Sequence, residues 1–220
     1  MSTRANSHKR LVFLDVETNG LSKIKNDIVQ FGAVISSMGN LRDFETVCEY
    51  FESTSPVQVQ ALRVHQIDNL RAKKMTKYQF FEVFARDTNF FDPSTPTVYV
   101  AHNAQFDLGV INNVLVVNGE RQISFGEQVR TLGEAARVRG NCWLDSVPYF
   151  RDVLGISARG SSSLETLGSR WVKNMELFTR ILRTSMEGRG QPVYNLGYHN
   201  ATFDSFVLYG IFLAHLGKLI

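Results

Sequence analysis

Residues 11–20 of this chain read LVFLDVETNG, and they combine a strand, two acids and a turn. Residues 11–16 form a short apolar run with a carboxylate near its end, which predicts a buried strand. Asn19 and Gly20 predict a turn directly after it. The fold is therefore expected to begin with a buried strand that carries Asp15 and Glu17 near its carboxyl end.

The rest of the chain alternates between strand and helix patterns. Strands are predicted at residues 28–36, 41–51 and 97–101. Helices are predicted as two within 57–86, one at 103–117, further ones beginning near Asp145 and Ser163, and an apolar one at 201–216. These patterns predict an α/β fold, in which helices flank a central mixed β-sheet made of an antiparallel meander and parallel strands. We expect a flexible segment at 1–10 and a single domain over 11–220.

Composition restricts the class of protein. The chain has 220 residues, of which 44% are hydrophobic and 20% charged, and this excludes a disordered chain or a disulfide scaffold. Cys48 and Cys142 are expected to be buried, reduced thiols of an intracellular protein, in the cytoplasm or the nucleus. The longest nearly apolar stretch, 206–216, is too short to span a membrane, so we expect no membrane partner. A net charge of +3 is compatible with a polyanionic partner.

Four acids lie where apolar segments would bring them into the interior. Asp15 and Glu17 are two residues apart on the first strand and should face the same side. Asp107 and Asp204 each fall near the start of a predicted helix, where an acid is ordinary because it complements the helix dipole. Each acid taken singly has an ordinary explanation, but a buried carboxylate is costly unless it is paired or binds a cation.

Three motifs carry these acids: LDVETNG at 14–20, HNAQFD at 102–107 and HNATFD at 199–204. In this order they resemble the motifs of the DEDDh family of 3′–5′ exonucleases, which have a ribonuclease H-like fold. The resemblance extends over residues 11–216. Two departures are that residues 172–198 are longer than the usual link and that the third motif repeats the wording of the second. A tyrosine-type variant would need Tyr at the position of Asn200, so the histidine type fits better.

The resemblance implies a two-metal site. Two Mg²⁺ ions, which Mn²⁺ could replace, would be held by carboxylate oxygens and would neutralise charge on a phosphodiester. A histidine would act as the general base on the attacking water. The implied metal ligands are Asp15, Glu17, Asp107 and Asp204, and the implied general base is His199. His102 occupies the same place in the duplicated box, and we expect it to support the turn that presents Asp107.

The same resemblance implies a pocket for the 3′-terminal nucleotide. Its expected residues are Thr18, Asn19, Gly20, Leu21, His65, Asn103 and Phe106. For Leu21 and Phe106 the alternative is a place in the core. Residues 71–81, RAKKMTKYQFF, interleave basic and aromatic side chains as a single-strand binding surface does. The favoured interpretation is an exposed helical face whose apolar side lies in the core.

We therefore expect a divalent-metal-dependent 3′–5′ exonuclease that releases nucleoside 5′-monophosphates from the 3′ ends of single-stranded DNA or RNA. The chain ends sixteen residues after Asp204, which favours a freestanding nuclease over a polymerase subunit. The alternatives are a catalytically inactive nucleic-acid-binding module and a ribonuclease H-like endonuclease. The sequence leaves open the choice between DNA and RNA, and between a monomer and the homodimer that some relatives form.

Overall fold

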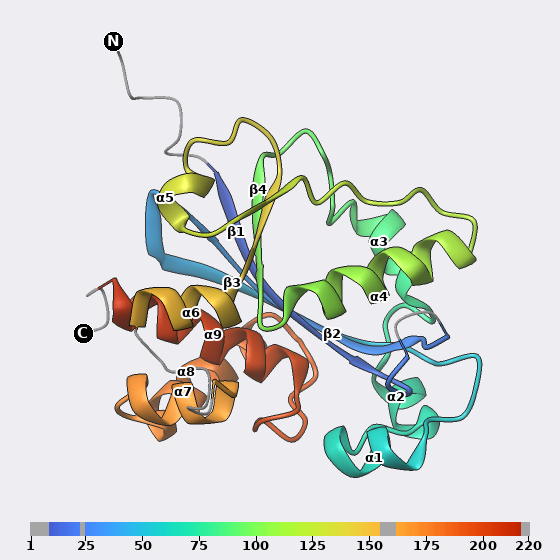
Figure 1. Cartoon of the computed structure of the whole chain (residues 1–220). Helices are drawn as coiled ribbons and strands as arrows, with labels where there is room; N and C mark the ends of the chain where they lie inside the picture. The colour runs from blue at the N-terminus through green and yellow to red at the C-terminus, as the bar shows by residue number, and fades with distance from the viewer. Residues whose placement is uncertain (1–8, 23–24, 155–161, 217–220) are drawn as a thin grey trace.

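A six-stranded mixed sheet forms the centre of the computed structural model, which describes residues 9–22, 25–154 and 162–216 (Figure 1). The strand order is β3-β2-β1-β4-β6-β5. β1 pairs with β2 and β2 with β3 in antiparallel fashion, whereas β1 with β4, β4 with β6, and β5 with β6 are parallel pairs. The predicted meander with added parallel strands is confirmed. The strands are β1 (Arg10–Thr18), β2 (Ile28–Ser37), β3 (Asn40–Tyr50), β4 (Thr97–Ala101), β5 (Glu127–Val129) and β6 (Cys142–Asp145).

β1 lies between two apolar cores. Leu11 and Phe13 belong to the core on one face of the sheet, and Val12 and Leu14 belong to the core on the other. This alternation follows from the two-residue period of a strand. Because both faces are covered, the middle of β1 is apolar, and its charged side chains lie at its two ends.

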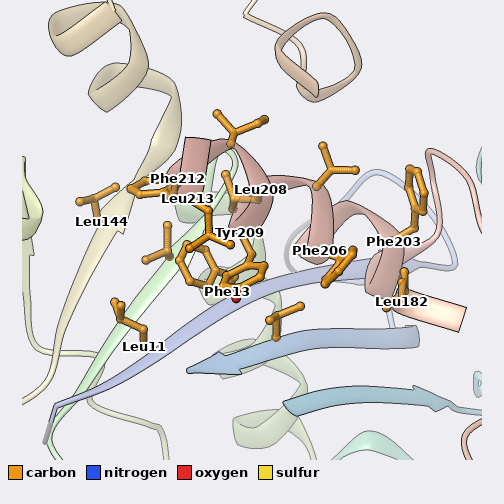
Figure 2. Close-up of a cluster of buried hydrophobic side chains, with 14 of the residues drawn as sticks. Leu11, Phe13, Leu144, Leu182, Phe203, Phe206, Leu208, Tyr209, Phe212 and Leu213 are labelled. Atoms are coloured by element: carbon orange, nitrogen blue, oxygen red, sulfur yellow. The ribbon is translucent and has the colours of Figure 1, made fainter. Parts of the chain in front are cut away.

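Helices cover both faces. In Figure 1, α6 to α9 gather on one side, α3 and α4 lie apart from them, and α1 and α2 lie beyond the carboxyl end of β1. Figure 2 shows the apolar side chains of α9 against β1, where the Phe13 ring packs 5.5 Å from that of Tyr209 and 5.4 Å from that of Phe212. The helices are α1 (Val59–His65), α2 (Asn69–Met75), α3 (Phe81–Thr88), α4 (Ala104–Val117), α5 (Leu132–Ala135), α6 (Ser146–Leu154), α7 (Leu164–Trp171), α8 (Met175–Gly188) and α9 (Ala201–His215).

The region predicted as two helices contains three, and that prediction is wrong in number. The chain leaves α1 through Gln66, which has a left-handed φ of 60°, and α2 starts afresh because the Asp68 side chain caps it. α3 follows separately. The short elements β5 and α5 were not predicted, since three or four residues are too few to show a period. Of the expected helix starts, both Asp145 and Ser163 are found as caps.

The folded part begins before residue 11, which corrects the expected boundary of the flexible segment. β1 starts at Arg10, and the buried ammonium group of Lys9 donates hydrogen bonds of 3.0 Å to the carbonyls of Ala135 and Val138. Residues 1–8 lie outside the described residues. Within the described ranges, no helix is both long and apolar enough to cross a bilayer.

The two cysteines are buried as predicted, but their surroundings are partly polar. The Lys9 ammonium lies 3.6 Å from the Cys142 sulfur, and the Gln30 amide lies 3.6 Å from the Cys48 sulfur. In the 71–81 segment, Phe81 is 2% exposed and belongs to the core, and Tyr78 packs against it partly buried, while Lys73, Lys74 and Lys77 are exposed. The exposed helical face is therefore the interpretation that the structure supports for this segment.

Candidate active site

The carboxyl end of β1 supplies two acids on one face of the sheet. Asp15 and Glu17 are both partly exposed, whereas Val16 between them is buried. Since side chains two residues apart in a strand point the same way, both carboxylates face the same space.

Asp107 reaches this space from the first turn of α4. The chain leaves β4 and turns at Asn103, which adopts a left-handed φ of 68° that asparagine tolerates. The backbone N–H of Val16 donates a hydrogen bond of 3.2 Å to Oδ1 of Asp107. This bond fixes the Asp107 carboxylate, 3% exposed, beside the strand that carries the first two acids.

Asp204 comes from the last part of the sequence and lies in the first turn of α9. Asn200 caps this helix, because its side chain accepts a hydrogen bond of 3.1 Å from the N–H of Phe203. The N–H of His199 donates a hydrogen bond of 2.9 Å to Oδ2 of Asp204. The other oxygen, Oδ1, is buried and has no hydrogen-bond partner within the described part of the chain.

His199 stands at the rim of the same space. Its side chain is exposed, and its backbone has a left-handed φ of 66°. A ring nitrogen of His199 and carboxylate oxygens of Glu17 and Asp204 all lie within 4.8 Å of one another. The structure thus brings together residues that are far apart in the sequence.

The charged forms of Asp15, Glu17 and Asp204 are disfavoured in this site. Burial, followed by the charges of Asp107, Asp204 and Glu17, raises the pKa of Asp15 well above its ordinary value. Burial and the charges of Asp204 and Asp107 raise the pKa of Glu17 to about 8. Burial and, to a smaller extent, the charge of Glu165 raise the pKa of Asp204 to about 7, against the lowering effect of the His199 hydrogen bond. Without a cation, the charged forms of these groups are therefore unfavourable at neutral pH.

These residues fit divalent cations. A cation would offset the mutual repulsion, and it would give the buried Oδ1 of Asp204 the partner that it lacks. A set of carboxylate oxygens suits a hard ion such as Mg²⁺ or Mn²⁺. Asp15, Glu17, Asp107 and Asp204 are the residues that could hold such ions.

Comparison with known families agrees with this geometry. The exonuclease model of the RNase T family matches residues 12–151, well over half of the chain. The chain belongs to this exonuclease family. The matched residues include Asp15, Glu17 and Asp107, but His199 and Asp204 lie beyond them. For the third motif, it is the packing of α9 against β1 and β2 that brings its residues to the site.

In the curated relatives of this exonuclease family member, the matching segment is a small part of a much longer protein. The PolC-type DNA polymerase III of Streptococcus mutans is 34% identical over 105 residues, which are 46% of this chain and 6% of that protein. The corresponding polymerase of Pediococcus pentosaceus is 29% identical over 116 residues, 52% of this chain and 7% of that protein. The chain therefore spans only a small part of these curated relatives.

Solved exonuclease structures share the fold. E. coli Exonuclease I in complex with a dT13 oligonucleotide superposes with a TM-score of 0.60 at 19% identity, over 96% of this chain and 41% of that one. Exonuclease X in complex with 5′ overhanging duplex DNA gives a TM-score of 0.55 at 16% identity, over 94% of this chain and 92% of that one. At these identities the likeness establishes the ribonuclease H-like exonuclease fold.

The loop after β1 exposes the Leu21 side chain next to buried, hydrogen-bonded residues. Leu21 is 76% exposed, so the core alternative for this residue is wrong. Asn19 is buried, with its amide donating to Ser55 and its side-chain oxygen accepting from the N–H of Asp27. A Cβ on Gly20 would lie 2.5 Å from the end of the exposed Gln58 side chain, which would have to move aside. Thr18 is buried, and its hydroxyl donates to the Gly20 carbonyl.

The remaining residues expected to line the nucleotide pocket differ in how far their side chains are exposed to solvent. Asn103 is exposed, and Phe106 is half-buried against the core that contains Leu108 and Val110. His65 is buried, and both of its ring nitrogens are engaged, one with the Thr18 carbonyl and the other with the N–H of Ile67. Because Nδ1 accepts from that N–H, the proton sits on Nε2 and is donated to Thr18. In this structure the His65 ring therefore holds the end of β1 through the Thr18 carbonyl.

The two histidines of the duplicated box are not equivalent. His102 is partly buried, and its Nδ1 lies 2.8 Å from the Ser146 hydroxyl at the start of α6. Burial lowers the pKa of His102. His199, in contrast, is exposed next to Glu17 and Asp204. The two histidines therefore differ in their exposure and in the groups that surround their rings.

Sequence reasoning did not single out Gln30. It lies fully buried in β2 and touches the first residue of α9. The signal was present, since Gln30 is the one amide in the apolar run IVQFGAV at 28–34. A buried amide must find hydrogen-bond partners, so its position marks a polar contact inside the core.

Proposed function

We propose that this chain is a divalent-metal-dependent 3′–5′ exonuclease that acts on single-stranded DNA and releases nucleoside 5′-monophosphates. The observation that supports this most directly is the convergence of four carboxylates and His199 at the carboxyl end of the central strand. Membership of the exonuclease family provides the reaction class.

Each residue has a role that follows from its place. When bound, two divalent cations would neutralise charge on the phosphodiester and on its attacking and leaving oxygens. Asp15, Glu17, Asp107 and Asp204 would hold them. His199 would accept the proton of the attacking water, because its exposed ring faces the same space as Glu17 and Asp204. General-base assistance of this kind is typically worth about 10²–10⁴-fold.

The proposed substrate follows from the surroundings of the site. The exposed Leu21, held on the loop at 18–20, offers an apolar surface on which a terminal base can stack. Asn103 and Phe106 lie at the start of α4, beside Asp107. E. coli Exonuclease I was solved with a single-stranded dT13 oligonucleotide, and the PolC-type relatives are DNA polymerases. These likenesses favour DNA, and RNA is the second substrate to test.

The test is digestion of matched substrates with and without Mg²⁺. A 5′-labelled single-stranded DNA should shorten stepwise from its 3′ end, and nucleoside 5′-monophosphate should appear in proportion. The matched RNA strand should be degraded more slowly. A circular single strand should survive.

The control variants are Asp15→Asn, which should be inactive, and Asp43→Asn, an exposed acid of β3 outside the site, which should retain full activity. Binding of the labelled strand without Mg²⁺-dependent nucleotide release would show an inactive binding module. Cleavage of the circle would show an endonuclease. Either result contradicts the proposal.

A further inference from the structure

The start of α9 is sealed inside the protein. Ala201 and Thr202 are both fully buried, and so are Ser205 and most of the helix beyond it. The first N–H groups of a helix have no partner within the helix. At a surface, water would satisfy them, but here the protein itself must do so.

Gln30 supplies one of these missing partners from another element. The N–H of Ala201, the first residue of α9, donates a hydrogen bond of 3.1 Å to Oε1 of Gln30 in β2. The capping residue Asn200 serves the N–H of Phe203. The buried helix start is therefore capped both from its own chain and across the sheet.

Both the backbone and the side-chain amide of Gln30 have hydrogen-bond partners. Its backbone is paired in the sheet between β1 and β3, and its Nε2 lies 3.6 Å from the Cys48 sulfur of β3 as a donor. With its amide nitrogen used in this way, its oxygen is left facing the helix. The orientation of the amide is thus determined by the contacts at both of its ends.

The register of the sheet gives this contact its significance. Gln30 lies directly opposite Glu17, and Gly32 lies opposite Asp15. Residues that face each other across an antiparallel pair extend to the same side of the sheet. The hydrogen bond from Gln30 to Ala201 therefore connects the strand pair that carries Asp15 and Glu17 to the helix that carries Asp204.

We propose that Gln30 is a positioning residue for the metal site. It holds the start of α9, and with it the Asp204 carboxylate, at a set distance from Asp15 and Glu17. The inference rests on the proposed function, because it assumes that these carboxylates hold divalent cations. Gln30 does not ligate the ions itself.

The test compares Gln30→Met with Tyr209→Phe. Methionine has a similar length to glutamine but cannot accept the hydrogen bond from Ala201. Tyr209 lies further along α9, and its buried hydroxyl donates to the Leu41 carbonyl, so its loss also removes one buried hydrogen bond from this helix. Both variants should melt at a lower temperature than the wild type, but only Gln30→Met changes the start of the helix.

Metal binding is measured without DNA, by following the melting temperature during a Mn²⁺ titration. Gln30→Met should need about 10-fold more Mn²⁺ for half-maximal stabilisation, since partners behind metal ligands typically contribute 10–100-fold to affinity or activity. Its kcat on the single strand should fall about 10-fold, with KM within about 2-fold. Tyr209→Phe should leave the Mn²⁺ midpoint and kcat within about 2-fold of the wild type.

A third variant, Gln30→Glu, retains an oxygen that can accept from Ala201, so its kcat should exceed that of Gln30→Met at saturating Mn²⁺. If Gln30→Met does not fold, the Mn²⁺ midpoint and kcat can still be measured on Gln30→Glu. An unchanged Mn²⁺ midpoint in Gln30→Met would overturn the inference, and so would an equal change in Tyr209→Phe. If the wild type binds Mn²⁺ but releases no nucleotide, the proposed function fails, while the midpoints still decide the role of Gln30.

Discussion

Gly32 offers a direct way to displace one carboxylate from the others. This residue of β2 faces Asp15 across the strand pair, and α9 crosses its backbone closely. A Cβ at position 32 would lie 2.1 Å from the backbone nitrogen of Thr202 and 2.2 Å from the carbonyl carbon of Ala201. Ordinary van der Waals contact begins near 3.4 Å, so Gly32→Ala must push the start of α9 away by more than 1 Å.

Asp204 lies in the same helical turn as these two residues, and it should move with them. A misplacement of about 1 Å in an active site can cost about 10²-fold in rate. We therefore expect kcat to fall by about 10²-fold in Gly32→Ala. Overpacking of this kind typically costs about 1–3 kcal/mol of stability, and each kcal/mol lowers Tm by about 2–4 °C in a chain of this size.

The assay measures kcat at saturating single strand and saturating Mg²⁺, together with Tm. The matched control is Gly210→Ala, further along the same helix, whose Cβ would lie 2.4 Å from the ring of Phe178. That clash is with a buried side chain of α8, away from the start of α9, so it should lower Tm while kcat stays within about 3-fold. Wild-type kcat in Gly32→Ala would refute the reasoning, because it would mean that the distance between Asp204 and Asp15 does not matter for turnover.

Three further predictions concern the charges and the histidines. Asp15→Asn should abolish nucleotide release but raise the Tm of the metal-free protein at neutral pH, because it removes an acid whose charge is disfavoured by burial and by its neighbours; a lower Tm would contradict this. The metal-free protein should lose stability as pH rises from about 4 to about 8, since the unfolded chain releases its carboxyl protons near pH 4 whereas folded Glu17 and Asp204 hold theirs to about 8 and about 7. Thermal melting across this range should show the decline, and saturating Mg²⁺ should remove it. His199→Ala should lower kcat by about 10²-fold with little change in Tm, whereas His102→Ala should mainly lower Tm; the reverse pattern would assign the general base to the other histidine.

Strands β1 to β4 and the long helices α4 and α9 could be predicted because their determinants are local, whereas no bounds were predicted for β6 or α8. An apolar run such as residues 11–16 can hardly form anything but a buried strand, and 201–216 is too apolar for any place except the interior. The short elements were missed for the converse reason. β5 is formed by pairing with β6 and not by its own pattern. The division of 57–86 depends on a single left-handed residue, Gln66.

The identity of the acids was also contained in the sequence, because each stands in a motif of its own. The local pattern placed Asp15 and Glu17 on one face and Asp107 and Asp204 at helix starts, and the structure agrees on all four. The equivalence of His102 and His199 could not be resolved in this way, since HNAQFD and HNATFD differ in one letter. Their environments differ because one box follows a buried strand, whereas the other follows a loop that packs partly buried against the core.

What the sequence determined by itself was therefore the set of chemical groups, namely four carboxylates and a histidine on elements of known type. What only the tertiary structure decided was how these groups are held relative to one another. Contacts across the sheet such as Gln30 with Ala201, or Gly32 with Thr202, join residues about 170 positions apart. No local pattern encodes such a pair, because the contact depends on the register of the strands and on the position of α9 against the sheet. Both are set by the packing of the whole core.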